Sequence, residues 1–550
     1  MSRFRSLTVI SPPEEVLMAQ TAAARKRTVK PSPIIESFDP ATGELVGTVE
    51  VTPADAVADV AREVARIQPG WALTPLAERL RVVGRAGDWV VAHKAELANL
   101  LTRENGKTLL ESWTMEILGV IDGFRWIANH GGRYLAPERI PNPQPYLKHK
   151  RHEIHYDPLG VVGIISPWNY PFSIPGGTVA QALAAGNGVL LKPSEHTPLI
   201  ANEIARAFEA GGLPRGLLRV VHGRRDTGGA LCEADAVRKI FFTGSVPTGQ
   251  RVLETAAKHL KQVQLELGGK DAAVVLADAD LGRAVAGTMW AGFANAGQTC
   301  VSVERVYVDR RVYPEYVERL TDLTRALRPG DPKDPATQVG PMNNDMQYGK
   351  VVELLDDAIA SGAQLLTGGP TEVPGLPGKF IAPVVLTDVD HSMRIMREEI
   401  FGPVVPVMAF DTEEEGLRLA NDSEFGLGAS VWTRDVRRGR MLADRLQAGM
   451  VWINDHAYSH AAIQTPWGGV KHSGTGVTHS KFGLYEMTDK RLVAVDGGRF
   501  PVPWWYPYDE AKRRGIGAIL DGLYGSDLGE RARRMWRHRE DLRSLLKRTQ

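Results

Sequence analysis

Val161-Val-Gly-Ile-Ile165 is the stretch that decides the fold class. It is a continuous run of mostly β-branched apolar residues, as strands buried on both faces of a parallel sheet require. Gly188-Val-Leu-Leu-Lys192 and Lys239-Ile-Phe-Phe-Thr243 have the same character, and residues with helical spacing separate the three runs. This alternation of strands and helices predicts a doubly wound, parallel α/β sheet.

The same alternation continues outward on both sides. Helical spacing occurs over Pro53 to Arg66 and Leu76 to Leu101, and apolar strands are expected over Ala272 to Leu276, Arg305 to Val308 and Val404 to Phe410. The chain has 550 residues, which at roughly 100–200 residues per domain predicts about three domains.

Composition excludes several classes of protein. Hydrophobic residues make up 43%, charged residues 24%, and the formal net charge is +1, so disorder and a nucleic-acid partner are not expected. The two cysteines, Cys232 and Cys300, exclude a disulfide framework and a cysteine-rich metal site, and we predict no metal. Charges interrupt every long apolar run and residues 1–33 lack a signal-peptide core, so we expect a loose N-terminal arm and a cytoplasmic protein.

Two segments have the character of nucleotide contacts. Phe242-Thr-Gly-Ser-Val-Pro-Thr-Gly249 follows a strand and opens a helix, whose N-terminal N–H groups suit a pyrophosphate. Lys192-Pro-Ser-Glu195 follows another strand, where ligands of open α/β sheets bind. Taken alone, the first segment is more typical of a plain strand-to-helix turn, and the second of a charged pair that is exposed to solvent.

Three further segments carry candidate catalytic groups. Cys300 ends the Gly-containing turn Gly297-Gln-Thr-Cys300, where a thiol can be exposed and activated as thiolate. Glu266 stands beside two glycines and can act as a general base, and the Asn169 amide can donate to an oxyanion. Each candidate has an alternative interpretation. Cys300 could be an inert buried thiol, which is what we expect of Cys232. Glu266 could be a solvated carboxylate at a strand end, and the segment around Asn169 could be only a rigid turn.

In this order and spacing, the segments resemble the aldehyde dehydrogenase superfamily, over about Ile35 to Val495. The matching segments are Pro167-Trp-Asn169, Lys192-Pro-Ser-Glu195, Phe242-Thr-Gly-Ser245, Glu266-Leu-Gly-Gly-Lys270, Gly297-Gln-Thr-Cys300, Glu398-Glu-Ile-Phe-Gly-Pro403 and Trp467-Gly-Gly-Val-Lys-His-Ser-Gly474. One departure is Pro466-Trp-Gly-Gly469, where the family usually has Pro-Phe-Gly-Gly.

The resemblance implies a Rossmann-type NAD-binding domain, an α/β catalytic domain and a small oligomerisation sheet. The implied ranges are 34–143 and 157–268 for the NAD-binding domain, 269–470 for the catalytic domain, and 144–156 with 488–495 for the sheet. A homodimer or homotetramer is implied as well. The N-terminal arm and a C-terminal extension, residues 496–550, fall outside the resemblance.

The mechanism that the resemblance implies is NAD-dependent oxidation of an aldehyde to its acid. The Cys300 thiolate attacks the carbonyl to give a thiohemiacetal, and the Asn169 amide and the Cys300 backbone N–H stabilise the oxyanion. Transfer of hydride to the nicotinamide leaves a thioester. Glu266 then activates water for hydrolysis.

Cofactor contacts are implied in the same way. Lys192 and Glu195 match contacts to the adenosine ribose, Ser245 to the pyrophosphate, Glu399 to the nicotinamide ribose, and Phe401 lies against the nicotinamide. The remaining expected contacts are Ile165, Ser166, Pro167, Trp168, Ser194, Gly244 and Leu267. Glu195 favours NAD because a carboxylate repels a 2′-phosphate, although some relatives with this Glu also use NADP.

Rival functions differ in the fate of the thioester or in the substrate. CoA-acylating relatives generally lack the Glu at position 266, and enzymes for succinic semialdehyde often carry a second cysteine, whereas Cys300 is followed by Val-Ser-Val. A non-catalytic scaffold would not need the three catalytic candidates. Phe172, Trp290 and Phe293 suggest a tunnel for an apolar, fatty or aromatic aldehyde, with ordinary packing as the alternative.

The C-terminal extension contains Pro501-Val-Pro-Trp-Trp-Tyr-Pro-Tyr508 and two stretches with helical spacing. The second stretch, from Leu528 to Leu546, interleaves apolar residues with arginines. Such a basic amphipathic helix can lie on a membrane surface. The alternative is that its apolar stripe packs on the parent domain or on a neighbouring subunit.

Overall fold

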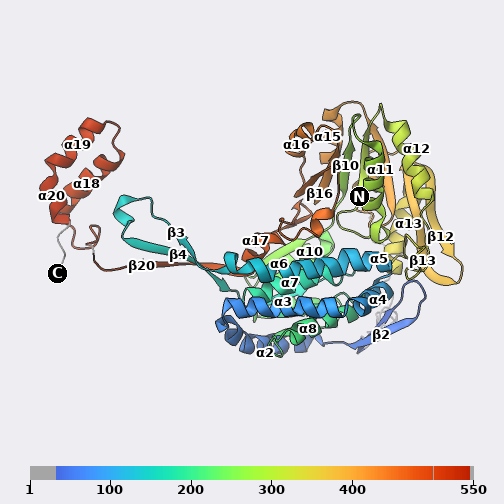
Figure 1. The fold of residues 1–550 in the computed structure, drawn as a ribbon, viewed down its shortest axis with the longest axis horizontal. Coiled ribbons are helices and arrows are strands. Elements are labelled where there is room, and N and C mark those ends of the chain that lie inside the picture. Colours follow the sequence, from blue (N-terminus) through green and yellow to red (C-terminus); the bar gives the residue numbers. More distant parts are fainter. Residues whose placement is uncertain (1–32, 500, 546–550) are drawn as a thin grey trace, which may run out of the picture.

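The computed structural model describes residues 33–499 and 501–545. Two larger sheets form the body of the molecule, and a smaller sheet projects from it toward the C-terminal helices (Figure 1). The arm predicted over residues 1–33 lies, except for its last residue, outside the described residues.

The first sheet has the strand order β19-β9-β8-β5-β6-β7. Neighbouring strands are parallel except β19, which is antiparallel to β9. The strands are β5 (Val161–Ile165), β6 (Gly188–Lys192), β7 (Leu218–Val220), β8 (Val237–Thr243), β9 (Gln262–Glu266) and β19 (Gly474–Thr475). The order reverses between β5 and β8, which confirms the doubly wound sheet and creates a ligand-binding crevice at the carboxyl ends of these strands.

Helices cover both faces of this sheet because its strand residues alternate between two apolar clusters. Val162 and Ile164 face one cluster and Val161 faces the other. The first cluster contains residues of α3 (Leu76–Ala92), α4 (Lys94–Asn105), α6 (Leu118–Leu135), α7 (Ser173–Ala184) and α8 (Leu199–Ala210), and the second residues of α2 (Ala54–Leu73), α9 (Arg225–Glu233) and α10 (Val246–Ala257). The helix expected over Leu76 to Leu101 is therefore two helices, because the chain leaves helical geometry at His93 (φ −104°, ψ 12°).

The second sheet has the order β12-β13-β14-β11-β10-β16-β17. Its strands are β10 (Asp271–Val275), β11 (Val303–Asp309), β12 (Gln364–Val373), β13 (Leu376–Thr387), β14 (Val404–Phe410), β16 (Gly428–Trp432) and β17 (Met450–Ile453). Its helices are α11 (Leu281–Phe293), α12 (Tyr313–Arg325), α13 (Asp345–Ala360), α14 (Arg394–Arg397), α15 (Glu413–Asn421) and α16 (Val436–Ala443). The three later strands expected from the sequence correspond to β10, β11 and β14.

Short elements connect these units. They are β1 (Ile34–Phe38), β2 (Leu45–Glu50), α5 (Leu109–Glu111), the π-helix η1 (Ser112–Ile117), the 3₁₀ turns η2 (Pro145–Leu147), η3 (Ala294–Gly297) and η4 (Tyr458–His460), β15 (Phe425–Gly426), β18 (Val470–Lys471) and α17 (Ser480–Glu486).

The projecting sheet has the order β20-β4-β3. Its strands are β3 (Glu138–Ile140), β4 (Lys150–Pro158) and β20 (Thr488–Asp496), and β20 is antiparallel to β4 over its whole length. The two segments assigned to a small sheet from the sequence therefore lie side by side. Their role in oligomer contacts stays a prediction.

The C-terminal extension forms α18 (Glu510–Tyr524), α19 (Leu528–Arg537) and α20 (Arg539–Leu545) at the far end of the projecting sheet (Figure 1). The second helical stretch expected there is broken at His538, so α19 and α20 pack against α18 separately. Trp536 on α19 is 70% exposed. Among the described residues, no helix has the length and apolar character needed to cross a membrane.

Candidate active site

A cavity lies at the carboxyl ends of β5, β8 and β9. Cys300 and Glu266 both line it. Ile165, Ser166 and Leu267, three of the expected cofactor contacts, line it too. The cavity thus connects two of the catalytic candidates with the edge of the first sheet where a nucleotide is expected to bind.

A left-handed turn presents Cys300 to this cavity. Asn295, Ala296 and Gly297 have φ values of 55°, 54° and 69°, an uncommon run that only Gly adopts without strain. A Cβ on Gly297 would come within 2.1 Å of the Gly402 carbonyl oxygen. The close approach of these two chain segments therefore requires glycine and determines where Cys300 lies.

The surroundings of Cys300 work against the thiolate expected from the sequence. Burial raises its pKa far above the ordinary range, and the carboxylates of Asp271, Glu266 and Glu399 raise it further. The thiol proton must therefore leave before Cys300 can act as a nucleophile. Cys232 is buried in α9 and has a pKa raised to about 11 by burial, as an inert thiol would.

Glu266 ends β9, and both of its carboxylate oxygens are buried without a hydrogen-bond partner among the described residues. Burial raises its pKa well above the ordinary value, and Gln264 opposes this shift. A carboxylate with a raised pKa in a cavity is suited to accept a proton near neutral pH.

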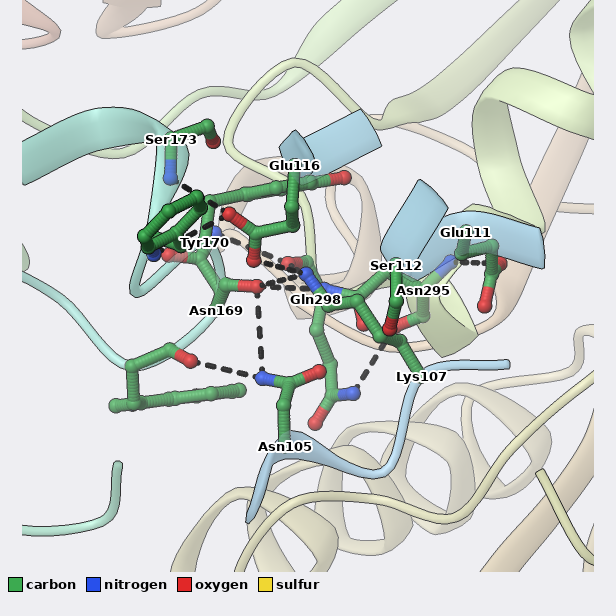
Figure 2. A network of polar contacts seen from close by, with 12 residues as sticks. Asn105, Lys107, Glu111, Ser112, Glu116, Asn169, Tyr170, Ser173, Asn295 and Gln298 are labelled. Atoms are coloured by element: carbon green, nitrogen blue, oxygen red, sulfur yellow. Dashed lines mark hydrogen bonds and ion pairs between the residues drawn. The ribbon is translucent and has the colours of Figure 1, made fainter. Parts of the chain in front are cut away.

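Asn169 lies beside the Cys300 turn rather than in the cavity wall. Its side-chain Nδ2 donates to the carbonyl of Gln298 at 3.0 Å, and its side chain is buried. Its backbone carbonyl accepts from Lys107 Nζ at 2.8 Å and from Asn295 Nδ2 at 3.1 Å (Figure 2). Asn105 Nδ2 lies 3.5 Å from the same oxygen.

The expected nucleotide contacts gather around β6 and α10. Lys192 Nζ donates to the Pro193 carbonyl at 2.9 Å and lies 3.7 Å from Glu195. Ser245 is the N-cap of α10, but its side chain does not cap the first backbone N–H groups. Ser166 Oγ is buried and has no partner among the described residues. The unpartnered Ser166 hydroxyl and the N–H groups at the start of α10 suit an anionic, hydroxyl-rich ligand.

The second sheet contributes the other wall of this crevice. Glu399 accepts from the Gly269 backbone N–H at 3.0 Å, and burial raises its pKa to about 7. A Cβ on Gly268 would lie 2.6 Å from the Glu399 carboxylate. The absence of a side chain at Gly268 therefore leaves the space that this carboxylate occupies. Phe401 meets the Trp168 ring edge-on with centroids 5.5 Å apart.

Comparison with known proteins gives the same assignment. The family model described as "Aldehyde dehydrogenase family" matches residues 28–493. The chain belongs to this family.

Similar proteins and solved structures cover most of this chain. A betaine aldehyde dehydrogenase of Rhizobium leguminosarum bv. trifolii is 41% identical over 86% of this chain and 96% of its own length. The crystal structure of a putative aldehyde dehydrogenase from Burkholderia cenocepacia superposes with a TM-score of 0.82 at 34% identity, covering 85% of this chain and 95% of that one. The crystal structure of a betaine aldehyde dehydrogenase from Staphylococcus aureus in complex with NAD⁺ superposes with a TM-score of 0.81 at 31% identity. It covers 86% of this chain and 96% of that one.

The structure of this aldehyde dehydrogenase also corrects the expected substrate tunnel. Trp290 lines the cavity with Cys300, as expected. Phe172 is instead buried in the core, and Phe293 lines a separate surface pocket. The other aromatic residues of the catalytic cavity are Tyr170, Phe241, Phe242, Tyr458 and Trp467, with His460 and His479 beside them.

Sequence reasoning missed the segment between Asn105 and Ile117. Lys107 and Glu116 are fully buried there and form an ion pair of 2.6 Å. The pattern Thr108-x-x-Glu111, which is a capping box at the start of α5, was the available signal. It indicates a helix start and gives no sign that this segment contacts both catalytic turns.

Proposed function

We propose that this aldehyde dehydrogenase oxidises an aldehyde to the carboxylic acid through a thioester on Cys300, with NAD as hydride acceptor. The observation that carries the proposal is that Cys300 and Glu266 share a single cavity with the carboxyl ends of β5 and β8. A nucleophile, a carboxylate of raised pKa and a nucleotide crevice thereby meet at one point.

In this proposal the Cys300 thiol first releases its proton to solvent, so that the sulfur is a thiolate when it attacks. The sulfur then attacks the aldehyde carbon, and negative charge develops on the carbonyl oxygen. Nδ2 of Asn169 has two hydrogens, of which the Gln298 carbonyl accepts one. The other hydrogen and the Cys300 backbone N–H stabilise the oxyanion by about 3–4 kcal/mol per donor.

The residues around β6 and α10 fit a dinucleotide. The buried, unpartnered Ser166 Oγ, the uncapped N-terminus of α10 and the buried Lys192 ammonium offer donors to ribose and phosphate oxygens. Ile165, Pro167, Trp168, Ser194, Gly244, Ser245 and Leu267 complete this side of the crevice in our proposal. When bound, the nicotinamide supplies the acceptor for the hydride of the thiohemiacetal.

Glu195, Glu399 and Phe401 determine which cofactor binds and how it is oriented. The Glu195 carboxylate favours a ribose with a free 2′-hydroxyl, hence NAD over NADP. Glu399, held by the Gly269 N–H, would accept from the nicotinamide ribose, and Phe401 would contact the nicotinamide ring.

Glu266 acts as the base for the hydrolytic water. Its two oxygens have no competing partner among the described residues, so a water molecule can donate to either. Attack of the water forms the C–O bond, breaks the C–S bond and passes a proton to Glu266. A CoA-acylating enzyme would not need this carboxylate.

The substrate is best described as an aldehyde with an apolar or aromatic substituent. Rings of Tyr170, Trp290 and Trp467 line the cavity, and no lysine or arginine does so among the described residues. Burial lowers the pKa of His460 to about 4 and of His479 to about 3, so both imidazoles are neutral at pH 7. A carboxylate substituent, as in succinic semialdehyde, would therefore lack a cationic partner.

A quaternary ammonium aldehyde is the second candidate. Aromatic faces bind such cations, and several relatives are named betaine aldehyde dehydrogenase. The Lys107 ammonium, however, already lies 4.2 Å from the centroid of the Tyr170 ring, which makes this ring a weaker cation receptor. The uncharged substituent therefore ranks first.

A panel of hexanal, benzaldehyde, betaine aldehyde and succinic semialdehyde, each with NAD and with NADP and without CoA, tests the proposal. We expect the highest kcat/KM for hexanal or benzaldehyde with NAD, and the free acid as product. A preference for betaine aldehyde would favour the second candidate, and a requirement for CoA would contradict hydrolysis. Absence of NADH and NADPH with every aldehyde would contradict the oxidation itself.

We also propose that β3, β4 and β20 mediate a homodimer or homotetramer, and that the C-terminal extension contacts a membrane surface. Leu492 and Val495 on β20 are 63% and 52% exposed, as a contact strand would be before assembly. Light scattering of the full chain tests the first point, and a monomer would contradict it. Vesicle pelleting against a chain truncated after Gly498 tests the second, and equal pelleting would remove it.

A further inference from the structure

We propose that Lys107 and Glu116 are positioning residues for the oxyanion donor Asn169. The inference rests on the proposed role of Asn169 in the reaction. Neither residue lines the cavity with Cys300, and both side chains are 0% exposed. They act through the two turns that carry the reacting groups.

The ion pair forms three hydrogen bonds with the backbone of the first turn, which runs from Asn169 to Ser173. Lys107 Nζ donates to Glu116 Oε1 at 2.6 Å and to the Asn169 carbonyl at 2.8 Å. Glu116 Oε2 accepts the consecutive backbone N–H groups of Phe172 and Ser173, at 3.2 Å and 2.7 Å. Figure 2 shows both ends of the turn tied to this one pair. The backbone from Asn169 to Ser173 cannot rotate without breaking charge-assisted bonds.

The same segment also holds the second turn, which leads to Cys300. Glu111 Oε1 accepts the backbone N–H of Asn295 at 2.7 Å (Figure 2). Asn295 Nδ2 in turn donates to the Asn169 carbonyl and, at 3.2 Å, to the Gln298 carbonyl, the group that also binds Asn169 Nδ2. The relative position of the Asn169 amide and the Cys300 turn is thus determined from residues 105–116.

Tyr170 couples the pair to the residue before the nucleophile. Lys107 Nζ lies 4.2 Å from the centroid of the Tyr170 ring, and Tyr170 Oη is 2.8 Å from Thr299 Oγ1. Removal of Lys107 therefore loosens the contact with Thr299 as well as the one with Asn169.

Local backbone geometry supports a specialised role for this segment. Gly106 has φ 94°, and a Cβ there would lie 2.8 Å from Pro40 and 3.0 Å from Pro341. Glu116 lies in the six-residue π-helix η1, a feature that occurs frequently at functional sites. The segment is shaped to bring Lys107 and Glu116 to one place.

A buried ion pair is weak evidence for stability, since well-packed apolar residues of similar volume often replace one without loss. Removal of one partner alone leaves an unpaired buried charge. The informative variant is therefore the double replacement Lys107→Met with Glu116→Gln, which removes both charges and retains the side-chain volumes.

Four proteins test the inference as a cycle: the native chain, Asn169→Ala, the double variant, and the triple variant. We expect Asn169→Ala to lower kcat by about 100- to 1000-fold and the double variant to lower it on the order of 100-fold. The triple variant should be less than about tenfold slower than Asn169→Ala, because the pair acts mainly through Asn169 and only secondarily through Tyr170 and Thr299. The dissociation constant of NAD, measured by fluorescence quenching, should not change.

Losses in kcat that multiply would overturn the inference and leave the role of Asn169 intact. An Asn169→Ala enzyme with native kcat would instead overturn the proposed oxyanion donor, and the inference with it. If the double variant does not fold by circular dichroism, the single change Lys107→Met, which removes the donor to the Asn169 carbonyl, takes its place in the same cycle. A native kcat for that folded variant would also overturn the inference.

Discussion

Two buried lysine–glutamate pairs flank the catalytic cavity, one on the side of Asn169 and one on the side of Glu399. Lys107–Glu116 measures 2.6 Å and Lys270–Glu304 measures 2.9 Å, and all four side chains are at most 2% exposed. In each pair the lysine also donates to a backbone carbonyl, of Asn169 or of Ile395.

The two glutamates use the same contact for different loops. Glu116 accepts the N–H groups of Phe172 and Ser173, and Glu304 those of Ile400 and Phe401. The first pair therefore holds the turn beside Cys300, and the second holds the loop that contains Phe401 and follows Glu399. The two loops thus have separate supports with the same pattern of contacts, and under the proposed function the first would serve acyl transfer and the second cofactor orientation.

A third carboxylate lacks the lysine. Glu104 accepts the N–H groups of Leu199 and Ile200, at 2.7 Å and 3.0 Å, and the Ser37 hydroxyl. Burial raises its pKa to about 7. The bonds from Leu199, Ile200 and Ser37 lower the pKa of Glu104, but the effect of burial outweighs them.

The largest effect is expected on the acyl side. Cys300→Ala should lower NADH formation by at least about 10⁴-fold, because no other side chain can form the covalent intermediate. NAD binding, followed by fluorescence quenching, should remain as in the native chain, since the cofactor crevice is unaltered. Turnover near the native rate would contradict the assignment of the nucleophile, and Cys232→Ala, a buried thiol outside the cavity, is the matched control.

Glu266→Gln should lower kcat by about 10²- to 10⁴-fold, as expected for a lost general base. In the native enzyme the raised pKa of Glu266 means that the base form is lost as pH falls through that pKa. The native kcat should therefore rise with pH along one limb, and the variant should lack that limb. A pH profile unchanged by the substitution would assign the titration to another group.

Glu104→Gln tests the carboxylate that has no lysine. Its folded pKa of about 7 exceeds the ordinary value, so the folded state binds the proton more tightly. The stabilisation is complete at acidic pH and is lost as pH rises to about 7, by roughly 3 kcal/mol at 1.36 kcal/mol per pKa unit. Denaturant unfolding at pH 5 and pH 8 should show this loss in the native chain and not in the variant.

The smallest effect is expected on the cofactor side. Lys270→Met with Glu304→Gln, the counterpart of the Lys107 and Glu116 double variant, should raise KM for NAD by about tenfold, worth about 1.4 kcal/mol. The rate of Cys300 alkylation by iodoacetamide should not change, because the Cys300 turn has other supports. A fall in kcat with KM for NAD unchanged would contradict the assignment of Lys270 and Glu304 to cofactor binding and of Lys107 and Glu116 to the positioning of Asn169.

The sequence predicts what local pattern determines. Continuous apolar runs give β5, β6 and β8, and the Gly/Ser turn after β8 gives the start of α10. The order of the motifs along the chain distinguishes Cys300, the candidate nucleophile, from Cys232, which matches no motif. The high pKa of the Cys300 thiol does not follow from its turn, because it depends on carboxylates that other segments bring near.

The contacts of the buried Lys107–Glu116 pair cannot be predicted from the sequence for the same reason. Lys107 and Glu116 are close in sequence, but their partners lie on the turn from Asn169 to Ser173 and are identified only by packing. The break at His93, likewise, interrupts a helical pattern that continues on both sides.

Covalent trapping tests the central claim most directly. Native enzyme and Glu266→Gln are mixed with benzaldehyde and NAD, quenched in acid within seconds and analysed by intact mass spectrometry. Because acylation precedes the hydrolysis that Glu266 assists, the variant should accumulate a benzoyl adduct, which peptide mapping assigns to Cys300, while the native enzyme accumulates little. NADH formation by the variant without any adduct at Cys300 would contradict the thioester mechanism.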